Sequence, residues 1–211
     1  MEVNSSYLSL QQEVMVIKFS PLKSLFFIGV SLCLVLVWGF LMGQPSMSQS
    51  ALRAQVQITG DDITGTLNLS QRQDGVVRIW GQVQGNPTKL TPGLHGFHIH
   101  SVGVCDPNAD PAYSSAGGHF DPGPFGNELP VQENHPYHMG DLPNLEVDAA
   151  GVATYSTQTS RVTLSEGPLT LFDGDGSAVI IHLLKDQQKA GGTAAEAGGA
   201  RIACGVVTLS Q

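Results

Sequence analysis

The stretch at 93–141 begins GLHGFHIHS (93–101) and closes with NHPYHMGDL (134–142). It holds six of the chain's seven histidines, namely His95, His98, His100, His119, His135 and His138. The seventh, His182, stands in the strand-like run SAVIIHLL. Neutral imidazole is the commonest protein ligand for zinc and copper, so this concentration indicates a metal site. We interpret the rest of the chain as the scaffold that holds this site.

The spacing of the histidines suggests which of them act together. His98 and His100 flank one residue of an expected strand, and side chains at i and i+2 of a strand point to the same face. Such a pair alone is a weak signal, because many occur on surfaces by chance. His135, His138 and Asp141 form a second cluster that suits tetrahedral zinc. With His119 and His182 added, the ligands are enough for two sites, which leaves His95 as spare.

The region that follows residue 50 has the pattern of an all-β protein. Short alternating runs are separated by turns rich in Gly, Pro, Asn and Asp, which is typical of a sandwich or barrel. We expect strands in AQVQIT, ITGTLNLS, VVRIWGQVQ, GFHIHS, GVATYST, the pair VTL and LTLF, SAVIIHLL and RIACGVVTL. Two long connections, 102–147 and 185–200, interrupt the strands. Loops of this length inside a compact domain are usually functional, and the first carries half of the histidines.

The first fifty residues have the character of a targeting segment rather than of a core. Residues 25–42, LFFIGVSLCLVLVWGFLM, carry no charge and follow Lys18 and Lys23. The run is long for a cleaved signal and adequate for one membrane span. Three readings remain open: an uncleaved anchor, a signal cleaved before Ala51, and a buried core helix. In the first two, the N-terminus stays cytoplasmic and the domain at 51–211 is exported to a periplasm or the extracellular space.

Charge and cysteine content narrow the function further. The net charge of −8 and the lack of a basic run argue against a nucleic-acid partner. Cys33 lies in the apolar run, so Cys105 and Cys204 are the only pair in the exported part. In an oxidising compartment we expect these two to form a disulfide.

Five segments in order, GLHGFHIHS, SAGGHFDP, HMGDLPNL, VIIHLLKD and GGARIACGVV, resemble the copper/zinc superoxide dismutases. The resemblance covers roughly 54–211 and implies an eight-stranded Greek-key β-barrel, or flattened sandwich, with two long functional loops. It also implies an enzyme that converts superoxide into dioxygen and hydrogen peroxide with copper and zinc as cofactors. Related enzymes are monomers or homodimers, and membrane contact would come through 25–42 if that segment is uncleaved.

The resemblance gives each matching residue an expected role. His98, His100 and His182 match copper ligands, and His119 matches the histidine that bridges copper and zinc. His138 and Asp141 match zinc ligands, Arg201 matches the arginine that faces the anion beside copper, and Asp186 matches an aspartate linking histidines of the two sites. Cys105 and Cys204 match the family's disulfide. His119 and Arg201 are thus the expected catalytic residues.

The sequence departs from the family pattern at two places. The family has a zinc-ligand histidine eight or nine residues before the one matched by His138, whereas here the candidate is His135, three residues before it. The loop at 185–200 also lacks the charges expected to guide superoxide. A metal-storage protein, a zinc hydrolase and a structural adhesion sandwich are the alternatives. A metal-storage protein is disfavoured because Arg201 accompanies a full set of copper positions. A zinc hydrolase is disfavoured because no glutamate is adjacent to the histidines. An adhesion sandwich is disfavoured because it would not need the histidines.

Overall fold

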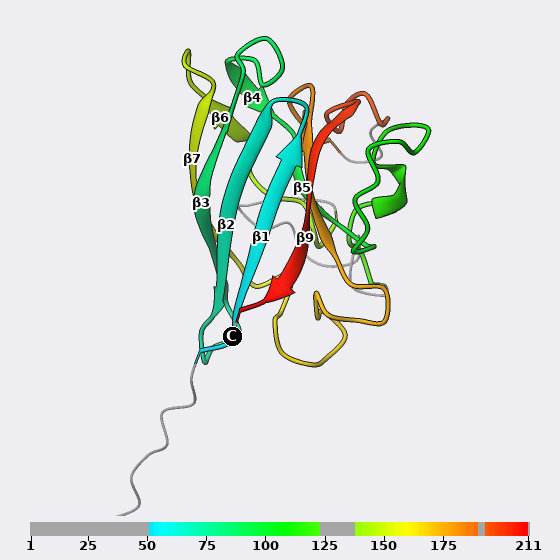
Figure 1. The fold of residues 1–211 in the computed structure, drawn as a ribbon. Helices are drawn as coiled ribbons and strands as arrows, with labels where there is room; N and C mark the ends of the chain where they lie inside the picture. Colours follow the sequence, from blue (N-terminus) through cyan, green and yellow to red (C-terminus); the bar gives the residue numbers. More distant parts are fainter. Residues whose placement is uncertain (1–50, 123–137, 190–192, 211) are drawn as a thin grey trace, which may run out of the picture. The chain divides into compact units, whose positions relative to one another are not determined.

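The computed structural model describes residues 51–122, 138–189 and 193–210, which belong to the compact unit Ser50–Gln211 (Figure 1). The expected targeting segment at 1–50 and His135 therefore lie outside the described residues. The described elements are β1 (Arg53–Gly60), β2 (Ile63–Gln71), β3 (Val77–Gly85), β4 (Gly93–His95), β5 (Phe97–His100), a 3-10 turn η1 (Ser114–Ala116), β6 (Leu145–Val147), β7 (Val152–Thr159), β8 (Ala178–His182) and β9 (Arg201–Leu209).

The described strands form a large antiparallel sheet and a two-stranded antiparallel pair. Seven of them pair in the order β5-β8-β9-β1-β2-β3-β7, and β4 pairs with β6. Only Gly96 separates β4 from β5, and a turn at 148–151 joins β6 to β7, so the two-stranded pair connects the two ends of the larger sheet. Counting β4 and β5 as one bent strand gives eight. The eight-stranded Greek-key β-barrel expected from the sequence is confirmed.

Alternation of side chains fills the interior of this barrel. Val56, Ile58, Leu67, Leu69 and Ile79 are all at most 1% exposed, and their polar neighbours along β1, β2 and β3 face outward. Burying these apolar side chains is the main stabilising contribution to such a fold.

Strand β8 is buried on both faces, which determines where the site lies. Val179 and Ile181 belong to the interior of the barrel. Ala178 and Ile180 belong instead to a second apolar cluster outside it, with Tyr113, Ala116 and Cys204. The first long loop thus covers the outer face of β8. A strand covered on both sides reads as a continuous apolar run, as AVIIH does.

One pair of expected strands is not formed. VTL and LTLF make only an isolated bridge between Thr163 and Thr170, with Leu164 and Leu171 buried. The apolar residues of this segment therefore anchor a loop to the core, and turn residues such as Gly167 interrupt any longer pairing. The barrel instead uses β4 and β6, whose three-residue lengths show no alternation to recognise.

Candidate metal centre

Strand β5 places two histidines on the outside of the barrel. Register pairs His98 with Ile180 and His100 with Ala178, so both imidazoles share the outer face of β8. Both side chains are 0% exposed because the loops cover this face. The intervening Ile99 points into the barrel core. The strand thus presents two imidazoles in parallel, as i and i+2 geometry requires.

The first long loop binds the free edge of β5. Ile99 donates its N–H to Gly140 O (2.8 Å), Phe120 donates to Ile99 O (2.9 Å), and Ser101 donates to Gly118 O (3.0 Å). Isolated bridges consequently pair His100 with His119 and His98 with Asp141. Residues that are distant in sequence are therefore held in register by main-chain hydrogen bonds.

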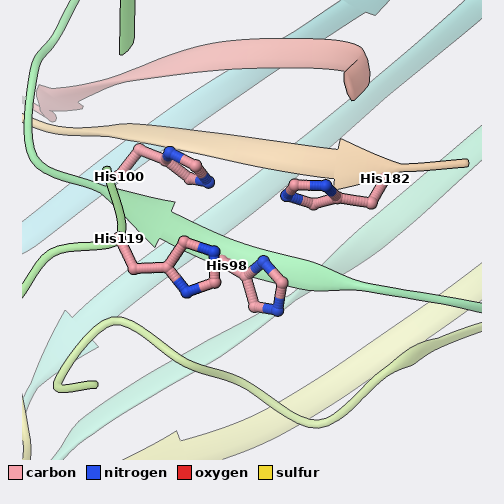
Figure 2. A group of neighbouring side chains, drawn as sticks. All are labelled: His98, His100, His119 and His182. Carbon is pink, nitrogen blue, oxygen red and sulfur yellow. The ribbon is translucent and has the colours of Figure 1, made fainter. Parts of the chain in front are cut away.

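The fourth histidine comes from the end of β8. A register shift between Ile181 and His182 lets His182 pair with Arg201, the first residue of β9. Figure 2 shows that His182 and His100 on one side, and His98 and His119 on the other, face a common space. One ligand nitrogen from each of the four lies within 4.8 Å of the others.

The hydrogen bonds of these rings leave the inner nitrogens without protons. His100 and His182 place Nδ1 3.0 Å from Gly117 O and Gly199 O, and His98 places Nε2 2.9 Å from Asp186. Within the described chain, the opposite nitrogens of these three rings have no hydrogen-bond partner although they are buried. Three buried lone pairs directed at one space fit a metal ion, and outer partners of this kind fix ligand orientation.

Electrostatics agrees with neutral rings. Desolvation by burial is the largest effect on His98, His100 and His182, and it holds the pKa of each below the usual 6.5, to about 3 for His182. The neighbouring histidines and Arg201 lower the pKa of His100 and His182 further. Metal binding needs neutral imidazole, so these ligands do not have to lose a proton near neutral pH.

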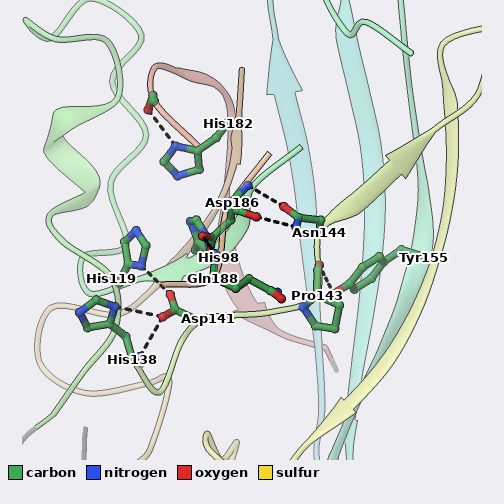
Figure 3. A network of polar contacts seen from close by, with 11 residues as sticks. His98, His119, His138, Asp141, Pro143, Asn144, Tyr155, His182, Asp186 and Gln188 are labelled. Atoms are coloured by element: carbon green, nitrogen blue, oxygen red, sulfur yellow. Dashed lines mark hydrogen bonds and ion pairs between the residues drawn. The ribbon is translucent and has the colours of Figure 1, made fainter. Parts of the chain in front are cut away.

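A second group shares His119. Its Nδ1 lies 2.5 Å from Asp141 Oδ1, while Asp141 Oδ2 accepts from the His138 N–H (2.8 Å) and lies 3.0 Å from His138 Nδ1 (Figure 3). The ligand atoms of His119, His138 and Asp141 lie within 4.8 Å of one another. The hydrogen bond to Asp141 raises the pKa of His138. Two imidazoles and a carboxylate suit zinc, which takes four ligands.

Arg201 is the cation of this site. Its Nη1 donates to Tyr113 O and its Nη2 to Gly117 O, both at 2.7 Å. Gly117 O therefore accepts from both Arg201 and His100. Among the described residues no carboxylate pairs with this guanidinium, and burial alone lowers its pKa. A fixed cation without a counter-charge beside the histidines can attract a small anion.

The remaining expected residues are also located. Cys105 and Cys204 form a disulfide with Cα atoms 5.7 Å apart, which ties the first long loop to β9. Buried His95 places its ring nitrogens 2.7 Å from His182 O and from Thr91 O, a structural arrangement. The sequence did not single out the carbonyls of Tyr113 and Gly117, or Asn144, which bonds to the main chain of Asp186. Every residue has a backbone carbonyl, so the sequence gives no sign of which carbonyls act as acceptors. Asn144 could have been noticed, because it is a polar residue between the apolar Leu142 and Leu145.

Comparison with known proteins decides the family. The sequence model described as Copper/zinc superoxide dismutase (SODC) matches residues 63–207. The chain belongs to the copper/zinc superoxide dismutase family. It is 35% identical to Superoxide dismutase [Cu-Zn] of Photobacterium leiognathi over 76% of this chain and 91% of that protein. It also resembles the crystal structure of the clock protein EA4 with a TM-score of 0.61 and 27% identity, over 79% of this chain and 100% of that chain.

Family membership confirms the expected activity and cofactors. The protein is an oxidoreductase that dismutates superoxide, and its cofactors are copper and zinc. The two groups of ligands are consistent with two metal ions. Nothing in the described parts of the chain forms a helix long and apolar enough to cross a membrane; the apolar run at 25–42 lies outside them.

Proposed function

We propose that the four-histidine group, His98, His100, His119 and His182, holds the redox-active copper. The observation that carries this assignment is the convergence on one space of three buried imidazole nitrogens that have no hydrogen-bond partner among the described residues. Their other nitrogens are tied to Gly117, Gly199 and Asp186, which keeps the rings oriented. When bound, copper would supply one-electron redox chemistry, in which one superoxide is oxidised to dioxygen and a second is reduced to peroxide.

The second group is the proposed zinc site. It consists of His119, His138 and Asp141, and we propose His135 as the ligand that completes it. His135 precedes His138 by three residues and lies outside the described part of the chain. Tetrahedral zinc needs a fourth ligand, and a histidine in the same loop is the nearest candidate. We propose that His119 is shared by the two metal sites, because it belongs to both groups of ligands and its Nδ1 faces Asp141.

Arg201 and His119 are the proposed catalytic residues. Arg201 pairs with His182 across β8 and β9, and its charge acts on His100 and His182, so an anion that it attracts arrives beside the copper ligands. Product peroxide needs protons as well as electrons. The His119 side chain is 15% exposed, whereas His98, His100 and His182 are buried residues. We propose that Nε2 of His119 takes a proton from solvent and hands it to the reduced product, whose second proton comes from solvent.

Asp186 is the proposed connection between the two sites. Its Oδ2 lies 2.9 Å from Nε2 of His98, which orients one copper ligand. We propose that it also reaches a zinc-ligand histidine, as the family pattern implies. Outer partners of metal ligands typically contribute ten- to a hundredfold to metal affinity.

The remaining proposals concern organisation and location. We propose that 1–50 is a targeting segment and linker, with the apolar run at 25–42 as signal peptide or anchor, and that 51–211 is the enzyme domain. The disulfide supports export to a periplasm or the extracellular space, because disulfides persist in oxidising compartments. The proposed state is a monomer or homodimer.

Dismutation by the purified protein, with copper and zinc determined on the same sample, tests the assignment. We expect activity with about one copper per chain, consistent with a single four-ligand group. His98→Ala should abolish activity together with copper binding, and Arg201→Ala should lower activity while copper remains. Stoichiometric copper without dismutation would refute the enzymatic role and favour metal storage. Full zinc content in His135→Ala would refute the proposed fourth zinc ligand.

A further inference from the structure

Asn144 belongs to the segment that carries Asp141, and this segment is firmly held. It follows Asp141 by three residues and precedes β6. Its neighbours Leu142 and Leu145 are both 0% exposed, and Pro143 O accepts a hydrogen bond from the buried Tyr155 hydroxyl at 3.0 Å. The main chain around Asn144 is therefore anchored to the barrel wall.

The side chain of Asn144 bonds twice to one residue of the other long loop. Its Nδ2 donates to Asp186 O at 3.0 Å, and its Oδ1 accepts from the Asp186 N–H at 2.8 Å, across 42 residues of sequence (Figure 3). A side-chain amide donates and accepts at once, whereas an ionised carboxylate only accepts and an apolar side chain does neither. The two bonds fix both the position and the rotation of the Asp186 main chain.

The carboxylate of Asp186 is held in turn. Its Oδ1 accepts from the Gln188 N–H at 2.7 Å, and Oδ2 is the partner of His98. Gln188 has a φ of 53°, the left-handed region that side chains other than glycine rarely adopt. The loop therefore bends sharply at this point to present its N–H to the carboxylate. With its main chain fixed by Asn144, Asp186 has little freedom in where it directs Oδ2.

We propose that Asn144 is a positioning residue for the copper centre. It acts through the main chain of Asp186 and then through the Asp186 carboxylate on the ring of His98. It joins the segment that carries Asp141 to the segment that carries Asp186, so it couples the zinc half of the site to the copper half. The proposal rests on the assignment of the four-histidine group to copper.

Gln71 offers a matched control for this arrangement. Its Oε1 accepts from the N–H groups of Leu164 and Ser165, and its Nε2 donates to Ser165 Oγ. It is likewise an amide that fastens a distant loop by its main chain, but its side-chain hydrogen bonds reach no described residue of either metal group. A purely structural role for Asn144 would make the two residues equivalent.

The experiment compares the full chain with Asn144→Ala, Asn144→Asp and Gln71→Ala after loading with Cu²⁺ and Zn²⁺. The readouts are the Cu²⁺ electron paramagnetic resonance spectrum and the copper dissociation constant from competition with a chelator. Asn144→Ala should weaken copper binding about tenfold, the lower end of the effect of outer partners, and should change the copper hyperfine splitting. Asn144→Asp keeps the acceptor but sets a carboxylate oxygen against Asp186 O, so it should also weaken copper binding, and it decides the matter if the alanine variant does not fold. Gln71→Ala should leave spectrum and affinity unchanged.

Two outcomes would overturn the proposal: Asn144 variants with the wild-type spectrum and affinity, or equal changes in Gln71→Ala. Dismutation by the wild-type protein is scored separately. Copper binding without dismutation removes the proposed function and leaves the comparison of variants intact. A wild-type chain that binds no copper overturns both.

Discussion

The buried histidines should make the stability of the metal-free protein strongly dependent on pH. An unfolded chain binds a proton at each histidine near pH 6.5, whereas the folded protein holds the pKa of His98, His100 and His182 lower. Below 6.5 the unfolded state therefore binds more protons, and the free energy of unfolding falls as pH falls. His138 behaves oppositely: its raised pKa adds stability below 6.5, which is lost as pH rises through the raised value.

The size of the acid effect follows from His182. Its pKa falls from 6.5 to about 3. At about 1.4 kcal/mol per unit, complete titration of this one buried group is worth about 5 kcal/mol. Between these values His182 contributes a slope of up to about 1.4 kcal/mol per pH unit, and His98 and His100 add to it in the same direction. His138 is partly exposed, so the loss above 6.5 should be weaker.

Urea denaturation of the metal-free protein, repeated from about pH 7 to about pH 5, measures this slope. His182→Gln removes one titrating group and should lower the slope by up to about 1.4 kcal/mol per pH unit. A free energy of unfolding that stays constant over this range would refute the reasoning. So would an unchanged slope in His182→Gln, because the acid loss would then come from other groups.

Four further predictions follow from the geometry. Replacing Cys105 and Cys204 by serine opens a loop of 99 residues and should lower the free energy of unfolding by up to about 4–5 kcal/mol, measured by denaturant titration; a loss below about 1 kcal/mol would contradict it. In Gly140→Ala the new Cβ would lie 2.3 Å from Ile99 O, so the free energy of unfolding should fall by about 1–3 kcal/mol and the content of both metals should fall. Gly118→Ala, which has open space at that position, should retain both metals. Arg201→Leu should lower kcat/KM at least about tenfold with copper content unchanged, and Arg201→Lys should lower it less; an unaltered kcat/KM would exclude Arg201 from anion attraction. Stepwise acidification with metal analysis should release zinc at a higher pH than copper, because the pKa of His138 is raised and those of the copper group are lowered; the reverse order would be inconsistent with these shifts.

The barrel could be predicted from sequence wherever strands were long enough to alternate. VVRIWGQVQ has buried residues at period two and forms β3, whereas RIACGVVTL forms β9 with Ala203, Cys204 and Gly205 buried in succession. Strands β4 and β6 could not be predicted, since three residues are too few to show a period. VTL and LTLF were wrongly expected as strands because their apolar residues serve a loop anchor. The pattern of apolar residues in a segment thus indicates that the segment is buried more directly than it indicates that the segment pairs with another strand.

The parts of the site that depend on particular side-chain types could be predicted from the sequence. The sequence predicted that His98, His100, His119 and His182 act together, and the structure brings them together. The assignment of metals to individual residues stays a prediction. The anchoring of Arg201 by Tyr113 O and Gly117 O was beyond prediction, because every residue offers a carbonyl and only the fold selects one.

The carbonyl of Gly117 has a consequence for redesign of this enzyme. A single oxygen receives both His100, a proposed copper ligand, and the guanidinium of Arg201, which we propose to attract the anion, so any remodelling that moves this oxygen displaces both side chains together. Metal affinity and substrate capture cannot be tuned independently through this loop. An engineer who transplants the centre into another scaffold would have to carry 113–119 across as one piece, with the turn intact.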